Sequence, residues 1–307
     1  MLNILEKRNL FFAISLLAIV PGLILAVARG LPLSIDFTGG SLLEVQFASG
    51  KSPSPAEVIS LYERFGVSDV QVQTTGEDVI IARSSFLDDT TRGQIETAME
   101  QEFSDKVTVR RFNSVGPTIG REVTLRAALA VLVAAIVVVI YITYAFRGVP
   151  HAILYGICAI IAMLHDVAVV LSLAAIGGRF FDWQIDALFL TALLTVIGFS
   201  VQDKIVVFDR IRENRTIFRR LPFETLVNHS IIQTLQRSIN TQLMTVEFML
   251  LALALFGGVT LREFAVILLV GLFSGTYSSI FIAAPILVAW ENQISGTSGP
   301  GTRQATT

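Results

Sequence analysis

The 307-residue sequence has few charged residues and a single cysteine. Asp, Glu, Lys and Arg make up 16% of the chain, against roughly 25% in an ordinary soluble domain. Cys158 lies in an apolar run, so an internal disulfide is excluded and we expect the thiol to be a small packing group. The three histidines, His151, His165 and His229, lack metal-ligand spacing, so the sequence predicts no metal site.

The motifs of soluble enzymes are also missing. There is no G-x-x-x-x-G-K-[ST], so no bound nucleotide is expected, and there is no H-E-x-x-H. The segment 198–202 (Gly-Phe-Ser-Val-Gln) lacks the second glycine of a nucleophile elbow. We therefore expect that the protein is not an enzyme, has no cofactor and has no nucleic-acid partner.

What the sequence does contain is six long apolar runs. A spanning helix needs about 20 apolar residues to cross roughly 30 Å of hydrocarbon. The runs cover residues 10–28, 127–146, 149–178, 185–208, 239–256 and 264–290. We therefore expect an α-helical polytopic membrane protein with six transmembrane helices.

The first run also has features of a signal peptide. Charged residues 6–8 precede it, and residues 26–28 (Ala-Val-Ala) resemble a small-residue cleavage site. The apolar stretch is longer than a typical signal core and contains Pro21. These two features favour an uncleaved helix.

The distribution of Lys and Arg orients the six helices. Lys7 and Arg8 precede the first span, Arg147 lies between the second and third, and a basic loop at about 209–238 joins the fourth and fifth. With six spans these three places share one side, which the positive-inside rule makes cytoplasmic. Residues 30–122 hold eight basic and fourteen acidic residues and are then periplasmic. We expect a bacterial inner-membrane protein with both termini in the cytoplasm.

The sequence of the acidic segment, residues 30–122, predicts a small α+β domain. Period-2 alternation predicts strands, and Ser54 with Glu57 forms a capping box that opens a helix with Pro at its first position. Asp88 and Asp89 cap a second helix. The predicted strands are 41–47, 69–74, 78–84 and 106–112, and the predicted helices end at about Phe65 and Phe103. The order β-α-β-β-α-β is the ferredoxin-like pattern.

Four segments follow from these boundaries. Residues 1–29 are the N-terminus and the first helix, 30–122 the ferredoxin-like periplasmic domain, and 123–292 a five-helix transmembrane region. The Gly/Ser/Thr-rich tail, 293–307, is expected to be disordered.

Charged residues inside the spans are the candidates for function. Each costs at least roughly 2.5–3.5 kcal/mol at the bilayer centre, so such residues usually line a polar path or pair with each other. At a rise of 1.5 Å per residue, Asp203 and Arg237 lie about 26 and 29 Å below the periplasmic face. Asp166 and Glu247 lie about 17 and 14 Å below it. We take these four and His165 as proton-coupling candidates.

Each candidate can also be explained by a structural role without proton transfer. Asp203 and Arg237 could be snorkelling residues near helix ends. Asp166 and a protonated Glu247 could serve only as hydrogen-bonding groups, and His165 is as well explained as a helix-packing donor. Lys204, at the start of the basic stretch, is expected to be solvated.

A stripe of small residues predicts close helix packing on the last span. Gly271 and Gly275 form G-x-x-x-G, and Ser279 and Ala283 continue it at four-residue steps. This is a structural signal and not a catalytic one.

Several motifs together carry a resemblance that covers nearly the whole chain. They are Asp36-Phe37-Thr38-Gly39-Gly40, Val115-Gly116-Pro117, His165-Asp166, Gly198-Phe199-Ser200 running into Asp203, residues 206–214 (Val-Val-Phe-Asp-Arg-Ile-Arg-Glu-Asn), Ser230, residues 233–235, Arg237, Phe256-Gly257-Gly258 and residues 275–279 (Gly-Thr-Tyr-Ser-Ser). In these the chain is similar to the SecF family, subunits of the bacterial SecD–SecF protein-export complex.

The resemblance implies a fold, partners and a function. The fold would be related to the resistance–nodulation–division transporters, and the partners would be SecD, the SecYEG translocon and a translocating preprotein. The proton-motive force would help to move preproteins out, with Asp203 and Arg237 as the family's proton-coupling positions. A passive scaffold of the translocon is the alternative. A small-molecule exporter is weaker, because it would normally need two six-helix halves.

The chain departs from the family pattern at two places. Asn-Asp followed by a small residue is usual, but here the sequence is Gln202-Asp203-Lys204. The stretch after Arg237, usually rich in Ser and Thr, holds Gln242, Met244 and Glu247.

The residues at similar depth also suggest a proton route. If the third and fifth spans face each other, a proton could pass from Asp166 or His165 to Glu247 and on towards Asp203.

Overall fold

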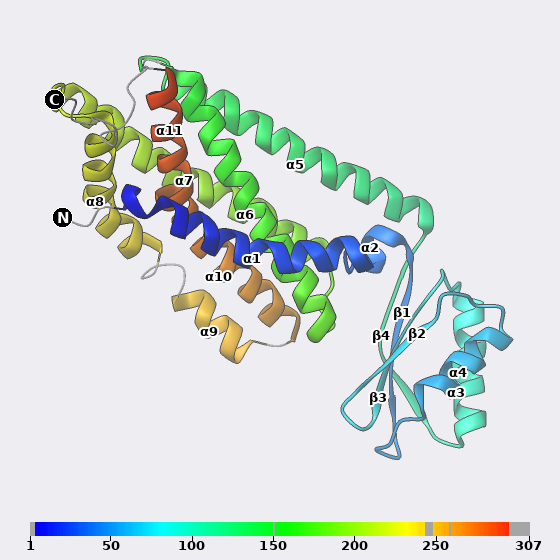
Figure 1. Cartoon of the computed structure of the whole chain (residues 1–307). Coiled ribbons are helices and arrows are strands. Elements are labelled where there is room, and N and C mark those ends of the chain that lie inside the picture. Colours follow the sequence, from blue (N-terminus) through cyan, green and yellow to red (C-terminus); the bar gives the residue numbers. More distant parts are fainter. Residues whose placement is uncertain (1–3, 150, 243–247, 258, 295–307) are drawn as a thin grey trace. The chain divides into compact units, whose positions relative to one another are not determined.

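The computed structural model describes residues 4–149, 151–242, 248–257 and 259–294. The chain divides into two compact units. A helical unit is made of Met1–Pro32 and Ala130–Thr307, and an α+β unit is made of Leu33–Leu129. Figure 1 shows the elements of both units.

Long apolar helices make up the helical unit. Its described elements are η1 (Leu5–Lys7), α1 (Arg8–Arg29), the C-terminal part of α5 (Pro117–Ala145), α6 (Ala152–Phe180), α7 (Ala187–Ile217), α8 (Phe223–Gln242), α9 (Phe248–Phe256), α10 (Val259–Ser278), the π-helical turn η3 (Ser279–Ala283) and α11 (Ala284–Ile294). Within the described residues, five helices are long and apolar enough to cross a membrane: Leu5–Arg29, Pro117–Ala145, Ala152–Phe180, Ala187–Ile217 and Leu261–Ile294.

Five of the six expected spans are therefore present as described helices. The fifth expected span, 239–256, includes residues 243–247, which lie outside the described residues. Its described parts are the end of α8 and the short helix α9.

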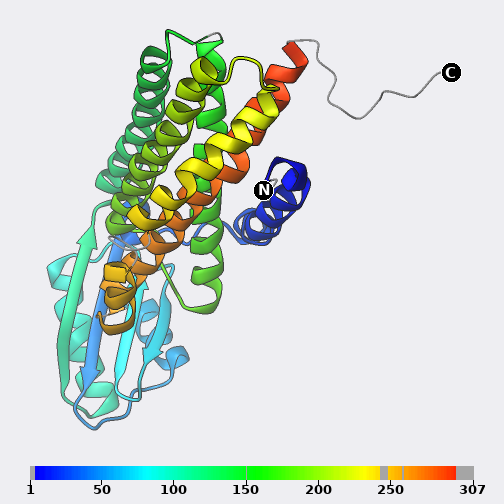
Figure 2. The ribbon, with the colours of Figure 1, turned by 90° about the vertical axis from the view of Figure 1, so that its left-hand side faces the viewer.

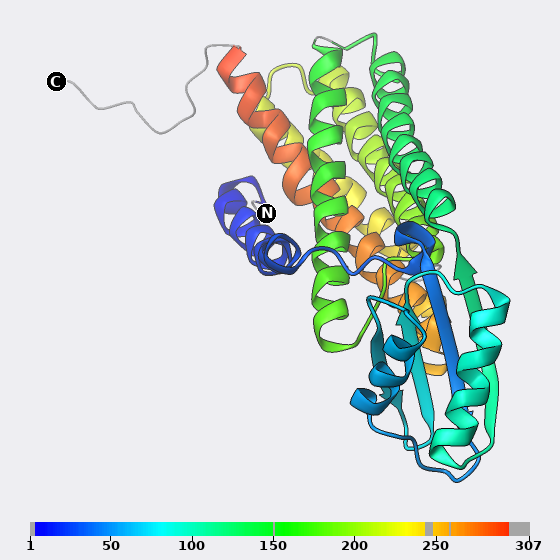
Figure 3. The same ribbon diagram turned by 90° about the vertical axis from the view of Figure 1, so that its right-hand side faces the viewer.

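Small residues bring the helices of this unit close together. α10 packs against α7 and α6, and α1 packs against α6. Helices α6, α7 and α10 lie side by side in Figures 2 and 3. A Cβ atom added at Gly271 would overlap Val196, and one at Gly275 would lie 3.1 Å from the Cα of Ser200. The backbones of α10 and α7 therefore approach at the glycines of the small-residue stripe.

The α+β unit contains a four-stranded antiparallel sheet with strand order β2-β3-β1-β4. Its elements are α2 (Ile35–Thr38), β1 (Gly40–Phe47), α3 (Pro55–Arg64), β2 (Gln71–Thr75), β3 (Val79–Ser84), α4 (Asp89–Phe103) and β4 (Val107–Val115). Helices α3 and α4 cover one face of the sheet (Figure 1). Alternate residues of β1, Leu43, Val45 and Phe47, are buried in the core beneath them.

Local capping chemistry fixes where these helices begin. The Ser54 side chain accepts from the Glu57 backbone N–H, and the Glu57 carboxylate accepts from the Ser54 N–H at 2.9 Å. The predicted capping box is therefore confirmed. Asp88 caps α4 by accepting from the Thr91 N–H at 3.0 Å.

Two of these capping carboxylates make the stability of the α+β unit depend on pH. Hydrogen bonds from Ser54 hold the pKa of Glu57 below its usual range, and those from Thr91 do the same for Asp88. A lowered folded-state pKa adds stability above the usual carboxyl pKa of about 4, and this stability is lost as the pH falls through the lowered value. We expect the melting midpoint of a fragment covering residues 33–116 to fall between about pH 5 and pH 2, as followed by circular dichroism.

The Ser54→Ala fragment provides the control. It lacks the side-chain hydrogen bond to Glu57, so its midpoint should lie below that of the parent at neutral pH and approach it at low pH. A constant difference between the two fragments across the pH range would contradict this origin of the pH dependence.

Candidate functional site

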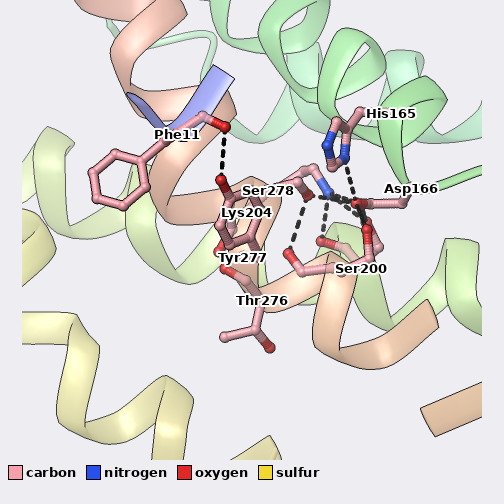
Figure 4. A network of polar contacts seen from close by, with 11 residues as sticks. Phe11, His165, Asp166, Ser200, Lys204, Thr276, Tyr277 and Ser278 are labelled. Carbon is pink, nitrogen blue, oxygen red and sulfur yellow. Dashed lines mark hydrogen bonds and ion pairs between the residues drawn. The ribbon is translucent and has the colours of Figure 1, made fainter. Parts of the chain in front are cut away.

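The most buried charge cluster of the described helical unit centres on Asp166 of α6. The residue is 1% exposed, and both carboxylate oxygens accept several hydrogen bonds. Oδ1 accepts from His165 Nδ1 at 3.1 Å and Ser274 Oγ at 2.8 Å; Oδ2 accepts from Ser200 Oγ at 2.5 Å, Ser278 Oγ at 2.7 Å and Lys204 Nζ at 2.9 Å. Three helices, α6, α7 and α10, therefore supply donors to one carboxylate (Figure 4).

Lys204 of α7 is the cation of this cluster. Its side chain is fully buried and forms an ion pair with Asp166. The Nζ also donates to the backbone carbonyl of Ser200 at 3.2 Å and to the Ser200 hydroxyl. The expectation that Lys204 is solvated is wrong. One turn of helix separates residues 200 and 204, so both lie on the face of α7 that packs against α6 and α10.

Asp203, the next carboxylate, is held by a different hydroxyl. It is 7% exposed, and its Oδ2 accepts from Thr276 Oγ1 of α10 at 2.8 Å. Asp203 directly precedes Lys204 in α7. The hydroxyl from which it accepts, that of Thr276, is not one of the donors to Asp166. Two buried carboxylates of the helical unit therefore lie in different polar surroundings.

Arg237 and Asp203 were expected at similar depth on neighbouring helices. α7 and α8 do pack against each other. However, Arg237 is exposed on α8, and among the described residues no hydrogen bond or ion pair joins it to Asp203. Glu247, the other candidate on the fifth expected span, lies outside the described residues.

His165 connects the cluster to the first helix through an aromatic ring. Its imidazole stacks on Tyr277, with ring centroids 6.2 Å apart, and the Tyr277 hydroxyl donates to the carbonyl of Phe11 at 2.8 Å. The Nε2 atom of His165 is buried and has no hydrogen-bond partner within the described part of the chain. The imidazole therefore links the cluster to α1 through Tyr277.

A second buried ion group lies where α6, α7 and α11 meet. The Glu291 carboxylate, 5% exposed, accepts from Arg215 Nη2 at 2.8 Å and lies 3.2 Å from His151 Nδ1. The three residues are far apart in the sequence, and the sequence analysis did not group them.

The structure thus adds hydroxyl and ammonium groups that the sequence analysis missed. Ser274 and Ser278 are one helical turn apart, like Ser200 and Lys204. This four-residue spacing beside Gly271 and Gly275 is the signal that could have indicated a polar helix face. Within the described residues no group of three or more His, Cys, Asp or Glu side chains could hold a metal ion. The cluster thus brings a carboxylate, an ammonium group and three hydroxyls together inside the helical unit.

Comparison with known proteins identifies the family. Residues 94–293 match the family described as "Protein export membrane protein SecD/SecF, C-terminal", and residues 24–50 match the "SecD/SecF GG Motif". The chain is 70% identical over 292 residues to the protein translocase subunit SecF of Anaerolinea thermophila, covering 95% of each chain. It is 46% identical to the SecF subunit of Thermobaculum terrenum, again over 95% of each.

A solved structure resembles the chain in three dimensions. The crystal structure of SecDF, a translocon-associated membrane protein from Thermus thermophilus, superposes with a TM-score of 0.79 at 34% identity. The match covers 95% of this chain and 39% of SecDF, so the chain spans about two fifths of that longer protein. On these matches, and on a helical unit with several apolar helices, the chain belongs to the SecD/SecF family of protein export membrane proteins.

Proposed function

We propose that this chain is a non-enzymatic auxiliary subunit of the Sec translocase that uses the proton-motive force together with SecD. In this role it assists preprotein export through SecYEG across the bacterial inner membrane. Family membership and the names of the relatives, protein translocase subunits SecF and SecDF, support the export role. The buried carboxylates of the helical unit support the coupling to protons.

The observation that carries the proton coupling is the position of Asp203. It is a buried carboxylate in a long apolar helix, next to a complete ion pair and hydrogen-bonded to a neutral hydroxyl of α10. A buried carboxylate near other polar groups is the usual carrier of protons in membrane transporters. Because Thr276 lies on α10, a change in the protonation of Asp203 would be felt at the contact between α10 and α7.

The proposal includes a membrane topology. The chain would cross the membrane six times, with both termini in the cytoplasm and a periplasmic, ferredoxin-like domain after the first helix. The strand order β2-β3-β1-β4 and the two helices on one face of the sheet support that class of domain. The basic residues of the α7–α8 region support a cytoplasmic position for this loop.

The Asp203→Asn variant tests the proton coupling. It keeps the shape of the side chain and the bond to Thr276 but cannot exchange a proton. We expect export of a model preprotein to lose its dependence on the proton gradient, while the variant still co-purifies with SecD. Export would be measured in vesicles that contain SecYEG and the SecD partner, with and without an ionophore.

Asp209→Asn is the matched control on the same helix. Asp209 is exposed and pairs with Arg212 at 2.6 Å, outside the buried cluster. This variant should keep gradient-dependent export. Gradient-dependent export by Asp203→Asn at the level of the parent would instead support a passive scaffold.

A further inference from the structure

We propose that α5 carries a binding site for an anionic phospholipid, with the lipid phosphate at Arg147 and an acyl chain along an exposed stripe of the helix. The stripe lies in the part of α5 that belongs to the helical unit, and the site includes the residues that follow the end of α5 at Ala145. The proposal rests on exposure, charge and helical spacing, and not on the proposed export function.

The stripe is formed by large side chains at helical spacing. Its members are 48% to 63% exposed: Val133, Ile136, Val137, Ile140, Tyr141 and Tyr144. Steps of three and four residues place them on one side of α5. The other side packs into the helical core, where Ile142 and Phe146 are buried. In Figures 2 and 3, α5 lies at the outer edge of the helical unit, so the stripe faces the surroundings of the protein.

The stripe has the length and the polarity of one lipid leaflet. At 1.5 Å per residue, the rise from Val133 to Tyr144 is about 16 Å. Half of a hydrocarbon core of roughly 30 Å is about 15 Å. The last two members are tyrosines, which are enriched where hydrocarbon meets headgroups. The stripe therefore runs from an apolar end to an interfacial end, in the same order as the acyl chain and headgroup of a phospholipid.

Arg147 continues this order beyond the tyrosines. Its guanidinium lies over the ring of Tyr144, 4.3 Å from the ring centroid, and this contact holds the charge at the end of the stripe. Arg147 is exposed, and within the described residues no carboxylate pairs with it. A guanidinium offers several N–H donors in a planar fork that matches phosphate oxygens. The residue is therefore a cation placed for a lipid phosphate.

The neighbouring charges leave Arg147 available to an anion. Arg212 of α7 donates to the carbonyl of Ala145 at 3.3 Å and pairs with Asp209 at 2.6 Å. The first contact covers a carbonyl at the negative end of the α5 dipole, which would otherwise repel a phosphate. The second balances the charge of Asp209. Together Arg147, Arg212 and Asp209 carry one positive charge.

An anionic phospholipid satisfies both parts of the site. A free phosphate ion would pair with Arg147 but would leave the apolar stripe uncovered. A zwitterionic lipid would cover the stripe, but its own ammonium group already balances its phosphate. A helix of another protein is the competing occupant of the stripe. The order from aliphatic residues to tyrosine to arginine favours the lipid, because it places the cation where a headgroup lies.

Native mass spectrometry of the purified full chain in detergent measures the binding. Phosphatidylglycerol and phosphatidylcholine would be titrated separately, and the parent should bind phosphatidylglycerol more tightly. Arg147→Gln removes the charge and should weaken phosphatidylglycerol binding about fivefold, the factor expected for one basic residue at a membrane surface. Its phosphatidylcholine binding should not change. Ile140→Asn interrupts the apolar stripe and should weaken the binding of both lipids.

Arg220→Gln is the matched control for a general effect of charge. Arg220 is an exposed arginine on the turn between α7 and α8, outside the stripe. This variant should bind both lipids as the parent does. Phosphatidylglycerol binding by Arg147→Gln at the level of the parent would overturn the proposal, and so would an equal loss in the two arginine variants. Displacement of the lipid by millimolar inorganic phosphate would assign Arg147 to a phosphate ion instead.

A photo-reactive side chain in native membranes identifies what covers the stripe. With benzoylphenylalanine in place of Ile140, irradiation should attach a phospholipid to the full chain, and mass spectrometry of the purified product should show the added mass. A cross-link to a protein would show that a partner helix covers the stripe and would overturn the proposal. Neither experiment uses export, so gradient-dependent export by Asp203→Asn would defeat the proposed function without affecting the lipid site.

Discussion

A Gly40→Ala variant is expected to unfold at a clearly lower temperature than the parent, because a side chain at this position has no room and no suitable backbone conformation. Gly40 has φ +119°, and an added Cβ would lie 2.6 Å from the carbonyl oxygen of Ser84 on β3. Together, the strained backbone and the overlap should destabilise the α+β unit by about 3 kcal/mol. Differential scanning fluorimetry or circular dichroism of the fragment 33–116 measures the loss.

The matched control is Gly50→Ala. Gly50 also has a positive φ, +76°, but no atom lies within 4 Å of its added Cβ. Its alanine variant should lose only the conformational part, about 1 kcal/mol. Equal losses at both positions would show that the contact with Ser84 is unimportant.

The neighbouring Gly39 explains why two glycines stand together in this motif. Its φ is +76°, and an added Cβ would lie 2.8 Å from the Cα of Pro117 at the start of α5. Gly40 meets β3 and Gly39 meets the beginning of α5. The pair therefore lets one turn of chain lie against two other segments of backbone at once.

The Gly271→Ala variant is expected to separate α10 from α7. The added methyl group would overlap Val196, and overpacking of this kind typically costs about 1–3 kcal/mol. Ser274 and Ser278 follow on the same helix, so the hydrogen bonds to Asp166 should weaken as well. The thermal midpoint of the purified chain in detergent should fall by several degrees.

Two further variants make the result specific. Gly198 lies on α7 with no atom within 4 Å of an added Cβ, so Gly198→Ala should leave the midpoint unchanged or raise it. Val196→Ala should restore part of the stability lost in Gly271→Ala, because it frees the space that the new methyl group needs. A loss in Gly271→Ala that Val196→Ala does not relieve would argue against the overlap as its cause.

The elements of the α+β unit could be predicted because their signals are local. The strand predicted at 41–47 is β1 (Gly40–Phe47), and the helix predicted after Ser54 is α3 (Pro55–Arg64). Alternating burial and capping residues act within a few positions of the chain. The short helix α2 (Ile35–Thr38) was missed because four residues are too few to show a period.

The candidate site was less predictable because it depends on how each helix is rotated about its axis. Distance along a helix could be estimated from residue counts, but it does not tell which way a side chain faces. Asp166 and Asp203 are both buried in the structure. Whether Lys204 or Arg237 faces its neighbours depends on contacts with α6 and α10, which are remote in sequence. A lysine beside a basic stretch was therefore expected in solvent, whereas the packing of α7 puts it inside.

The π-helical turn η3 (Ser279–Ala283) fixes the rotation of α11 about its axis relative to α10. It lies between Ser278, which binds Asp166, and Glu291, which binds Arg215. A π-turn holds one residue more than the α-helical turn it replaces. Deleting one residue there would leave a regular α-helix but would rotate everything after it by about 100° and shift it by about 1.5 Å. Glu291 would then turn away from Arg215 and His151, so this buried ion group depends on the extra residue of the π-turn.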